Sequence, residues 1–308
     1  MTTRLRIGTR GSPLALAQAH QTRDRLAAAH PALAQPGAIE IVVIRTTGDA
    51  ILDRTLSEAG GKGLFTKEIE EALVDRRIDL AVHSMKDVPT WLPDGLDICC
   101  VLPREDPRDA FFSPKAPSID ELPRGAVVGT ASLRRQALVL ARRPDLKVVP
   151  FRGNVDTRLR KLAEGEADAT LLALAGLNRL GIADRATSVI EPSVMLPAVA
   201  QGAIGIEVRA DDAETRALLA PLNCGDTMLR ITAERALLAV LDGSCRTPIA
   251  ALAELRPDGL HLDGLVASPD GRQILRASRH GAAADAAQLG SDAGRELKSR
   301  LPPGFFAP

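Results

Sequence analysis

Aromatic side chains are scarce in this chain of 308 residues, which has no tyrosine, one tryptophan and six phenylalanines. Proteins that bind single-stranded nucleic acid stack its bases on aromatic rings, and few rings are present here. An excess of charge is lacking as well, because 39 basic residues balance 39 acidic ones. No overall field therefore draws the chain towards a polyanion. Both deficits argue against an RNA-binding module or any other nucleic-acid partner.

Long apolar runs are also lacking. Residues 1–6 are not followed by the apolar core of a secretion signal, and no run reaches the about 18 residues that a membrane span needs. We therefore expect a cytoplasmic protein without a membrane partner.

Cysteine occurs four times, and no pair has the CxxC spacing that is typical of zinc sites. Cys99 and Cys100 are neighbours in a strand-like run, so their side chains should point to opposite faces. We expect neither a disulfide framework nor a metal ion. Cys245 lies in a loop where Gly243 ends a helix-like run and Pro248 prevents its continuation. On spacing alone a small buried thiol is the simpler interpretation, and an attachment point on a constrained loop is the alternative.

Strands and helices alternate through residues 5–219, which predicts α/β domains. Polar segments at 103–108 and 221–225 mark the expected domain boundaries. After residue 225 the pattern is a helix, three strands separated by Pro-Asp-Gly turns, and a last helix. This pattern predicts a small antiparallel α+β domain. The expected strands are 5–8, 39–46, 80–83, 95–102, 127–129, 147–150, 169–172, 204–208, 249–255, 260–266 and 273–277, and the expected helices are 13–30, 66–75, 174–180, 214–219, 228–241 and 284–299, with two more opening after Ser132 and Asn154.

Arginines recur where a predicted strand passes through a polar turn into a helix. Helix N-termini attract anions, so arginines there would add charge to anion sites. A cleft that holds a polycarboxylate or polyphosphate is one interpretation, and solvated helix faces are the other, because exposed ion pairs contribute only about 0–1 kcal/mol. The arginines concerned are Arg10, Arg134, Arg135, Arg152, Arg158 and Arg179.

Three other positions have simple interpretations. Lys62 lies in a Gly-rich segment without the spacing of a phosphate loop, so it indicates a flap with a cationic side chain. Asp87 follows a strand and is a candidate acid or base, although on its own it is better explained as a turn residue before Val88 and Pro89. His83 is better explained as part of a core strand than as a ligand.

Several motifs closely resemble the porphobilinogen deaminase family, and they occur in the family's order along the whole chain. They are IGTRGSPLAL (7–16), GKGLF (61–65), VHSMKDVP (82–89), GTASLRRQ (129–136), RGNV (152–155), AGLNRL (175–180), PAVAQGA (197–203) and the Cys245 loop LDGSCRTP (241–248).

The resemblance implies two α/β lobes like those of periplasmic binding proteins, with mixed, mostly parallel sheets. It also implies a small C-terminal α+β domain with a three-stranded antiparallel sheet. The expected domains are 1–102 together with 203–220, then 108–196, then 225–308. In this arrangement the strand near 204–208 returns to complete the first domain.

The resemblance further implies a transferase of tetrapyrrole synthesis, a hydroxymethylbilane synthase. Cys245 would carry a dipyrromethane cofactor through a thioether, and four porphobilinogen molecules would be joined to it with loss of ammonia before hydrolysis releases the product. Asp87 and Lys86 would be catalytic, and the protein would be a monomer. The positions implied to bind cofactor or substrate are Arg10, Ser12, Lys62, Ser84, Thr130, Ser132, Arg134, Arg135, Arg152, Gly153, Arg158, Arg179 and Gln201.

Three positions depart from the family's pattern, namely Glu58, Asp156 and Ala200, where Gly is common at the last. The main rival is a non-catalytic solute-binding protein with the same two lobes. Such a protein would not need Cys245 or a third domain.

Overall fold

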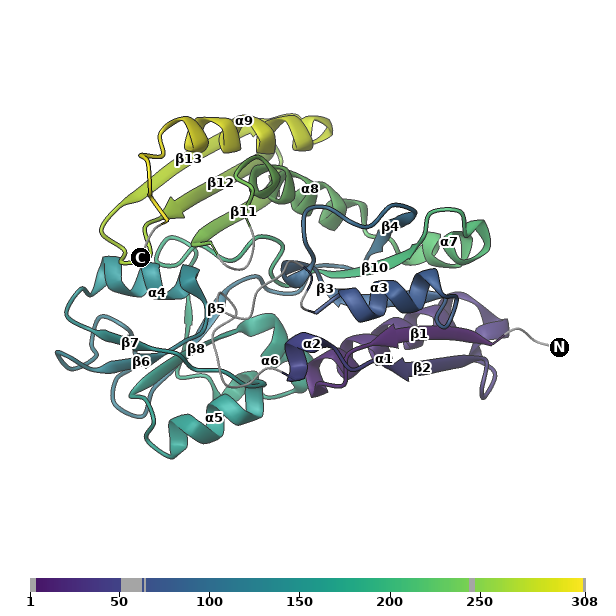
Figure 1. Cartoon of the computed structure of the whole chain (residues 1–308), viewed down its shortest axis with the longest axis horizontal. Helices are drawn as coiled ribbons and strands as arrows, with labels where there is room; N and C mark the ends of the chain where they lie inside the picture. Colours follow the sequence, from purple (N-terminus) through teal and green to yellow (C-terminus); the bar gives the residue numbers. More distant parts are fainter. Residues whose placement is uncertain (1–3, 51–62, 64, 244–246, 307–308) are drawn as a thin grey trace. The chain divides into compact units, whose positions relative to one another are not determined.

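The computed structural model describes residues 4–50, 63, 65–243 and 247–306 (Figure 1). Contacts within the chain divide it into two units. Unit 1 comprises Met1–Ile51, Gly61–Glu105 and Ala203–Met228, and unit 2 comprises Leu52–Gly60, Asp106–Gly202 and Leu229–Pro308. Within the described residues, no helix is both long enough and apolar enough to span a bilayer.

Unit 1 contains a five-stranded sheet in the order β2-β1-β3-β10-β4. The strands β1 and β2 are parallel, as are β1 and β3, whereas β10 is antiparallel to both of its neighbours. The sheet is therefore mixed and mostly parallel, as predicted. The strands are β1 (Leu5–Thr9), β2 (Ile39–Val43), β3 (Leu80–Ser84), β4 (Leu96–Val101) and β10 (Ile204–Arg209).

Helices cover both faces of this sheet. On one face Leu26 of α1 packs in a cluster with Leu80 and Val82 of β3. On the other face Ile69 of α3 packs in a cluster with Ala81. Because side chains alternate along a strand, neighbouring residues of β3 serve opposite clusters. The helical elements of the unit are α1 (Pro13–Ala29), η1 (Pro31–Ala34), α2 (Thr47–Ala50), α3 (Lys67–Val74), η2 (Met85–Asp87), α7 (Ala213–Leu219) and η4 (Ala220–Leu222), where η marks a 3₁₀ turn.

The first sheet of unit 2 repeats this design with the order β7-β6-β8-β5-β9. Here β5 is the strand that runs antiparallel to its neighbours β8 and β9. Its strands are β5 (Asp109–Phe112), β6 (Val127–Gly129), β7 (Lys147–Val149), β8 (Ala169–Ala173) and β9 (Ser188–Ile190), and its helices are α4 (Leu133–Arg142), α5 (Val155–Ala163), α6 (Leu174–Leu180) and the 3₁₀ turn η3 (Ala183–Arg185).

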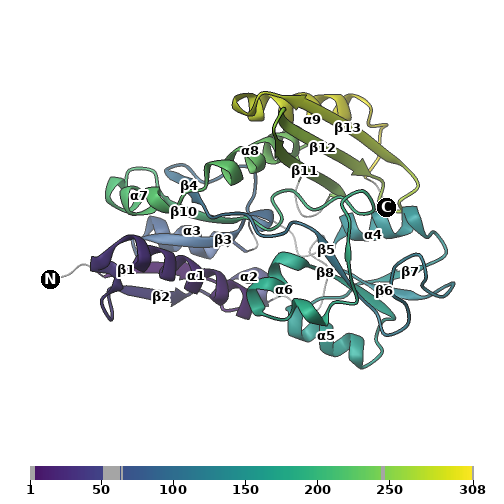
Figure 2. The same ribbon diagram turned by 180° about the vertical axis from the view of Figure 1, so that it is seen from behind.

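The second sheet of unit 2 is antiparallel, with the order β11-β12-β13. Helices α8 and α9 lie on one side of it (Figures 1 and 2). They approach each other through Gly290, where an added Cβ would press on the backbone of Ala233. The predicted α+β part is thereby confirmed. Its elements are α8 (Gly225–Val240), β11 (Ile249–Arg256), β12 (Gly259–Ala267), β13 (Ile274–Gly281), η5 (Ala283–Asp285) and α9 (Ala286–Ser299).

Some details differ from the sequence-based expectations. A β-bulge interrupts β4 opposite Ile206 and Glu207, so Cys99 and Cys100 both contact the same hydrophobic cluster instead of opposite faces. Burial raises the pKa of Cys99 to about 11 and that of Cys100 to about 12. Helix α2 lies in a segment expected to be loop, and β5 and β9 were not expected. The division into three domains stays a prediction.

Candidate active site

The turn after β3 carries the two predicted catalytic residues of unit 1. Met85 and Val88 are buried, at 1% and 4% exposure, and anchor the turn on both sides of Lys86 and Asp87. The backbone N–H of Met85 also donates to the carbonyl of Ala203 at 3.0 Å. Lys86 and Asp87 are left half-buried at the carboxyl end of a central strand, where ligands of open α/β sheets bind.

The side chain of Asp87 makes no hydrogen bond or ion pair with any residue of the described part of the chain. A half-buried carboxylate without a protein partner is available for a cationic or N–H group of a ligand. Its neighbour Ser84, at the end of β3, accepts a hydrogen bond from Gln18 Nε2 at 2.8 Å. The strand therefore ends with a hydroxyl group of fixed orientation, and the turn that follows it carries a carboxylate without a protein partner among the described residues.

The first strand-to-helix turn of unit 1 positions Arg10 and Ser12. Ser12 is the N-cap of α1, and its Oγ accepts from the backbone N–H of Ala15 at 3.3 Å. The guanidinium of Arg10 lies over the ring of Phe65, 4.1 Å from its centroid. Such a cation–π contact restrains a flexible side chain without using its hydrogen-bond donors.

His83 belongs to a buried polar pair below this strand end. Its Nε2 lies 2.9 Å from Glu207 Oε2, and both side chains are buried. The interpretation of His83 as a core residue is therefore confirmed.

In unit 2 the turn after β6 leads into α4 through Thr130 and Ser132. The backbone N–H of Ser132 donates to Thr130 Oγ1 at 3.1 Å, and Ser132 Oγ caps the helix by accepting from the N–H of Arg135. Cap formation uses both hydroxyl oxygens, so the predicted helix start is correct.

Arg134 and Arg135, in the first turn of α4, have buried guanidinium groups at 4% and 5% exposure. Both pair with Asp109, Arg134 Nη2 to Oδ2 at 2.8 Å and Arg135 Nη2 to Oδ1 at 2.7 Å. Burial alone raises the pKa of Asp109, but the two guanidinium charges outweigh burial and hold it well below its ordinary value. Burial lowers the pKa of Arg134, and Asp109 opposes that shift.

This cluster has spare capacity for an anion. One carboxylate between two guanidinium groups leaves one positive charge without a counter-ion within the cluster. The Nε–H groups of Arg134 and Arg135 are buried and have no acceptor among the described residues. An unmatched buried donor costs about 1–3 kcal/mol, and these two donors are enclosed by protein, so it is the surplus positive charge that would favour a carboxylate ligand nearby.

The turn after β7 carries Arg152 and Gly153, and Arg158 follows in the first turns of α5. Gly153 has φ of +120°, and an added Cβ would come within 2.6 Å of Thr157, so glycine is required. Asn154 caps α5 by accepting from the N–H of Thr157 at 2.9 Å. Arg158 Nε donates back to the carbonyl of Gly153 at 2.9 Å. Arg152 and Arg158 are half-buried.

Arg179 and Gln201 connect the segment around residue 200 to other parts of unit 2. Arg179 Nη2 donates to the carbonyl of Gly202 at 2.7 Å. Gln201 is buried, and its Nε2 donates to Asp109 Oδ1 at 2.9 Å. Gln201 is thus connected through Asp109 to Arg134 and Arg135.

Two carboxylates of this region escaped the sequence analysis. Asp109 opens β5 and balances the arginine pair, and an acid directly before an apolar run was the available signal. Glu234 of α8 is fully buried and accepts from the N–H of Ala200 at 2.6 Å and from that of Ala253 at 2.8 Å. Three further positions named from the sequence, Cys245, Lys62 and Glu58, lie outside the described residues.

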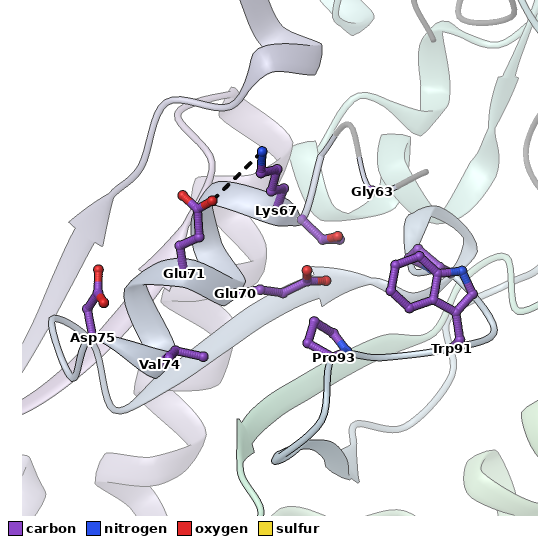
Figure 3. Close-up of a pocket in the computed structure, with 10 residues that line it drawn as sticks. Gly63, Lys67, Glu70, Glu71, Val74, Asp75, Trp91 and Pro93 are labelled. Carbon is purple, nitrogen blue, oxygen red and sulfur yellow. Dashed lines mark ion pairs between the residues drawn. The ribbon is translucent and has the colours of Figure 1, made fainter. Parts of the chain in front are cut away.

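A cavity of about 580 Å³ opens on unit 1 beside α3 (Figure 3). Glu70, Glu71 and Asp75 give it an acidic side, and the exposed ring of Trp91 gives it an apolar side. Burial raises the pKa of Glu70. The described residues that line this cavity include none of the predicted site positions.

Comparison with known families gives two matches. The model of the porphobilinogen deaminase, dipyromethane cofactor binding domain, matches residues 5–217, and that of the porphobilinogen deaminase, C-terminal domain, matches residues 228–299.

The sequence is also similar to individual proteins. Porphobilinogen deaminase of Paracoccus denitrificans (strain Pd 1222) is 62% identical over 302 residues, covering 98% of this chain and 96% of the relative. The chloroplastic porphobilinogen deaminase of Oryza sativa subsp. japonica is 60% identical over 305 residues, covering 98% and 85%. Among solved structures, the methionine binding protein MetQ is 15% identical with a TM-score of 0.47, over 76% of this chain and 96% of that chain.

Proposed function

The chain belongs to the porphobilinogen deaminase family, and from this premise we propose that it condenses four porphobilinogen molecules head to tail and releases linear hydroxymethylbilane. The family makes it a transferase of porphyrin synthesis with a dipyrromethane cofactor. The observation that carries the proposal is the family match over residues 5–217. This range contains every position predicted to bind cofactor or substrate, from Arg10 to Gln201.

The side chains of unit 2 suit the substrate's chemistry. Each pyrrole unit bears an acetate and a propionate group, so cofactor and growing product are polycarboxylates. The unbalanced positive charge of Arg134 and Arg135 fits such a carboxylate. We assign Arg152, Arg158 and Arg179 to the remaining carboxylates, because guanidinium groups bind carboxylates in a bidentate manner.

Asp87 is assigned the catalytic role. Loss of ammonia leaves positive charge on a pyrrole, and a carboxylate held beside the ring nitrogen stabilises that charge. Asp87 is half-buried, fixed by its turn and without a partner among described residues. We assign to it proton transfer as well, with Lys86 next to it as the cation that orients substrate carboxylates.

Cys245 is proposed as the attachment point. When bound there through a thioether, the dipyrromethane supplies the primer to which new units are added. Attachment keeps the reacting end local, so each addition takes place between positioned partners. We further propose that the protein works as a monomer in the cytoplasm, with porphobilinogen as substrate and without a nucleic-acid or membrane partner.

Intact-mass measurement on the purified chain tests the proposal. We expect a mass above that of the polypeptide by one dipyrrole, and loss of this increment in Cys245→Ser but not in the control Cys224→Ser. Alkylation followed by peptide mapping adds a second readout, because it shows whether the thiol of Cys245 is free. Cys99 and Cys100 should contribute little to the labelling, since thiols with raised pKa values react slowly at neutral pH. An unmodified, alkylatable Cys245 in active protein would refute the attachment.

The same preparations separate binding from chemistry at Asp87. Asp87→Asn should keep the dipyrrole mass and still bind porphobilinogen, while kcat falls by roughly 10²–10⁴-fold as for loss of a general acid–base group. Asp94→Asn, in an exposed turn nearby, is the matched control and should leave kcat unchanged. Near-normal turnover in Asp87→Asn would overturn the assigned role but not the attachment.

A further inference from the structure

Strand register in the C-terminal sheet brings two histidines together. In the antiparallel pair of β12 and β13, His261 lies directly opposite His280. Their rings stack with centroids 4.3 Å apart and planes inclined by 27°. His261 alternates along β12 with the buried Leu260 and Leu262, so it lies on the opposite face of the sheet, close to the β11–β12 turn.

Asp258 in that turn completes a cluster of three ligand-type groups. Its Oδ1 lies 2.9 Å from His261 Nε2, and its Oδ2 lies 3.5 Å from His280 Nε2. One donor atom from each residue lies within 4.8 Å of the other two. The three side chains therefore already point at one small volume.

From this geometry we propose that Asp258, His261 and His280 form a binding site for a divalent transition-metal ion of the zinc class. Bonds of about 2.1 Å to a tetrahedral zinc ion place ligand atoms about 3.4 Å apart. The two measured separations lie on either side of this value. Because a metal ion binds an imidazole in the plane of its ring, the stacked rings must rotate out of their parallel arrangement when the ion binds. Two imidazoles with one carboxylate suit zinc, nickel or copper rather than magnesium or calcium, and water would fill the fourth position.

This site differs from the zinc sites that cysteine spacing would have revealed. No cysteine takes part, and two of the three ligands are joined only by strand pairing across a hairpin. None of its three residues is assigned to the transferase reaction. Metal bound here would tie the β11–β12 turn to β13, and occupancy would stabilise the folded chain by mass action.

Two contacts oppose metal binding. His280 Nε2 donates to the backbone carbonyl of Asp258 at 3.0 Å and must lose this hydrogen bond, and Arg256 contacts His261. Arg256 Nη2 pairs with Glu254 at 2.7 Å, and its Nη1 lies 3.5 Å from His261 Nδ1. That contact favours the tautomer with the proton on Nε2, whereas a metal on Nε2 requires the proton on Nδ1. Replacing Arg256 removes a nearby positive charge and releases Glu254, the register partner of His261 on β11.

Calorimetric titration of Zn²⁺ into the chelator-treated, full-length chain without a histidine tag tests the proposal. We expect one site whose affinity falls by about tenfold or more in His280→Ala and in Asp258→Asn, since even outer partners of metal ligands contribute 10–100-fold. The matched control is His20→Ala, because His20 is exposed on α1, outside the cluster. It should bind as the parent does.

Arg256→Gln provides a prediction of opposite sign, because its affinity should rise above that of the parent chain. Cobalt absorption supplies the geometric readout, and a tetrahedral-type spectrum is expected in the parent and lost in His280→Ala. Absence of saturable zinc binding in the parent would overturn the proposal. Equal affinity in His280→Ala and His20→Ala would do so too. These readouts are independent of turnover and of the dipyrrole mass, so they fail separately from the proposed function.

Discussion

Ala200 is a residue whose backbone conformation conflicts with its side chain. Its φ of +57° lies in the left-handed region, which costs a residue with Cβ about 1–2 kcal/mol. The hydrogen bond from its N–H to Glu234 Oε2, at 2.6 Å, holds the conformation in place. The resemblance to the family indicates that Gly is common at this position. The positive φ explains that preference, because glycine adopts such an angle without steric strain.

Replacing Ala200 by glycine should leave the free energy of unfolding within about 1 kcal/mol of the parent. Relief of about 1–2 kcal/mol is offset by a similar sum of chain entropy and one buried methyl group. Ala137→Gly is the control, because Ala137 is fully buried inside α4 and gains no relief. It should lose about 2 kcal/mol. Urea unfolding of both variants measures the difference, and equal losses would show that Ala200 is not strained.

At the scale of elements, the turn η2 depends on a glycine in the neighbouring strand. Met85 packs against Gly205 of β10, where an added Cβ would collide with the Met85 sulfur. Since β10 pairs with β3 at this point, Gly205 leaves the space in which the start of the turn is anchored. The position of Asp87 thus depends on a residue more than a hundred positions away in sequence.

Gly205→Ala should therefore lower both stability and kcat. Overpacking of this kind costs about 1–3 kcal/mol and displaces the anchor of the catalytic turn. Gly264→Ala is a matched control, because its Cβ would collide with Leu237 of α8 and with no residue of that turn. It should lose similar stability in urea unfolding while kcat of the folded fraction stays unchanged. Equal kcat in the two variants would contradict a role for Met85 in positioning Asp87.

Elements with strong local signals were predictable from the sequence. Apolar runs located β1, β3 and β8, and the caps Ser12, Ser132 and Asn154 located helix starts correctly. By contrast, β5 and β9 have only four and three residues, and β5 opens with a charged side chain. Their strand character comes from pairing with distant partners, which local periodicity does not contain.

The arginine pair shows the same limit within the site. Its helix-start position was predictable, and its link to cofactor or substrate stays a prediction. The burial of these two guanidinium groups against Asp109 was not predictable. Asp109 lies 25 and 26 positions earlier in the chain, on the strand β5. Sequence spacing can identify the charges of a site, but it does not show which charge is already balanced within the protein.

At the scale of the whole molecule, each five-stranded sheet contains one strand that is antiparallel to its neighbours. In both sheets this strand comes soon after the chain passes from one unit to the other. The strand β5 follows the crossing after Glu105, and β10 follows the crossing after Gly202. Local patterns identified 204–208 only as a lone strand, and its pairing with β3 and β4 is a non-local fact. Cooperative stability therefore depends on contacts that join distant segments, and Asp109 provides several of them.

Asp109 joins β5, α4 and Gln201, so its ionisation should influence stability towards acid. Its pKa in the folded chain lies below the value of about 3.9 expected when unfolded. Between these values the unfolded chain binds more protons, so stability decreases as pH falls. The contribution of Asp109 is complete above about pH 5 and diminishes below pH 4.

Asp109→Asn should cost about 3–5 kcal/mol at pH 7, because two buried guanidinium groups lose their counter-ion. The difference from the parent should shrink as pH falls below 4, because the unfolded parent then takes up a proton at Asp109 that the folded parent does not. Asp120→Asn is the control, because its pairing with Arg142 is exposed and contributes about 0–1 kcal/mol. Urea unfolding from pH 3 to 8 measures all three proteins. A parent whose stability does not change over this range, or a constant difference between parent and Asp109→Asn, would mean that Asp109 is not the charge that holds these segments together.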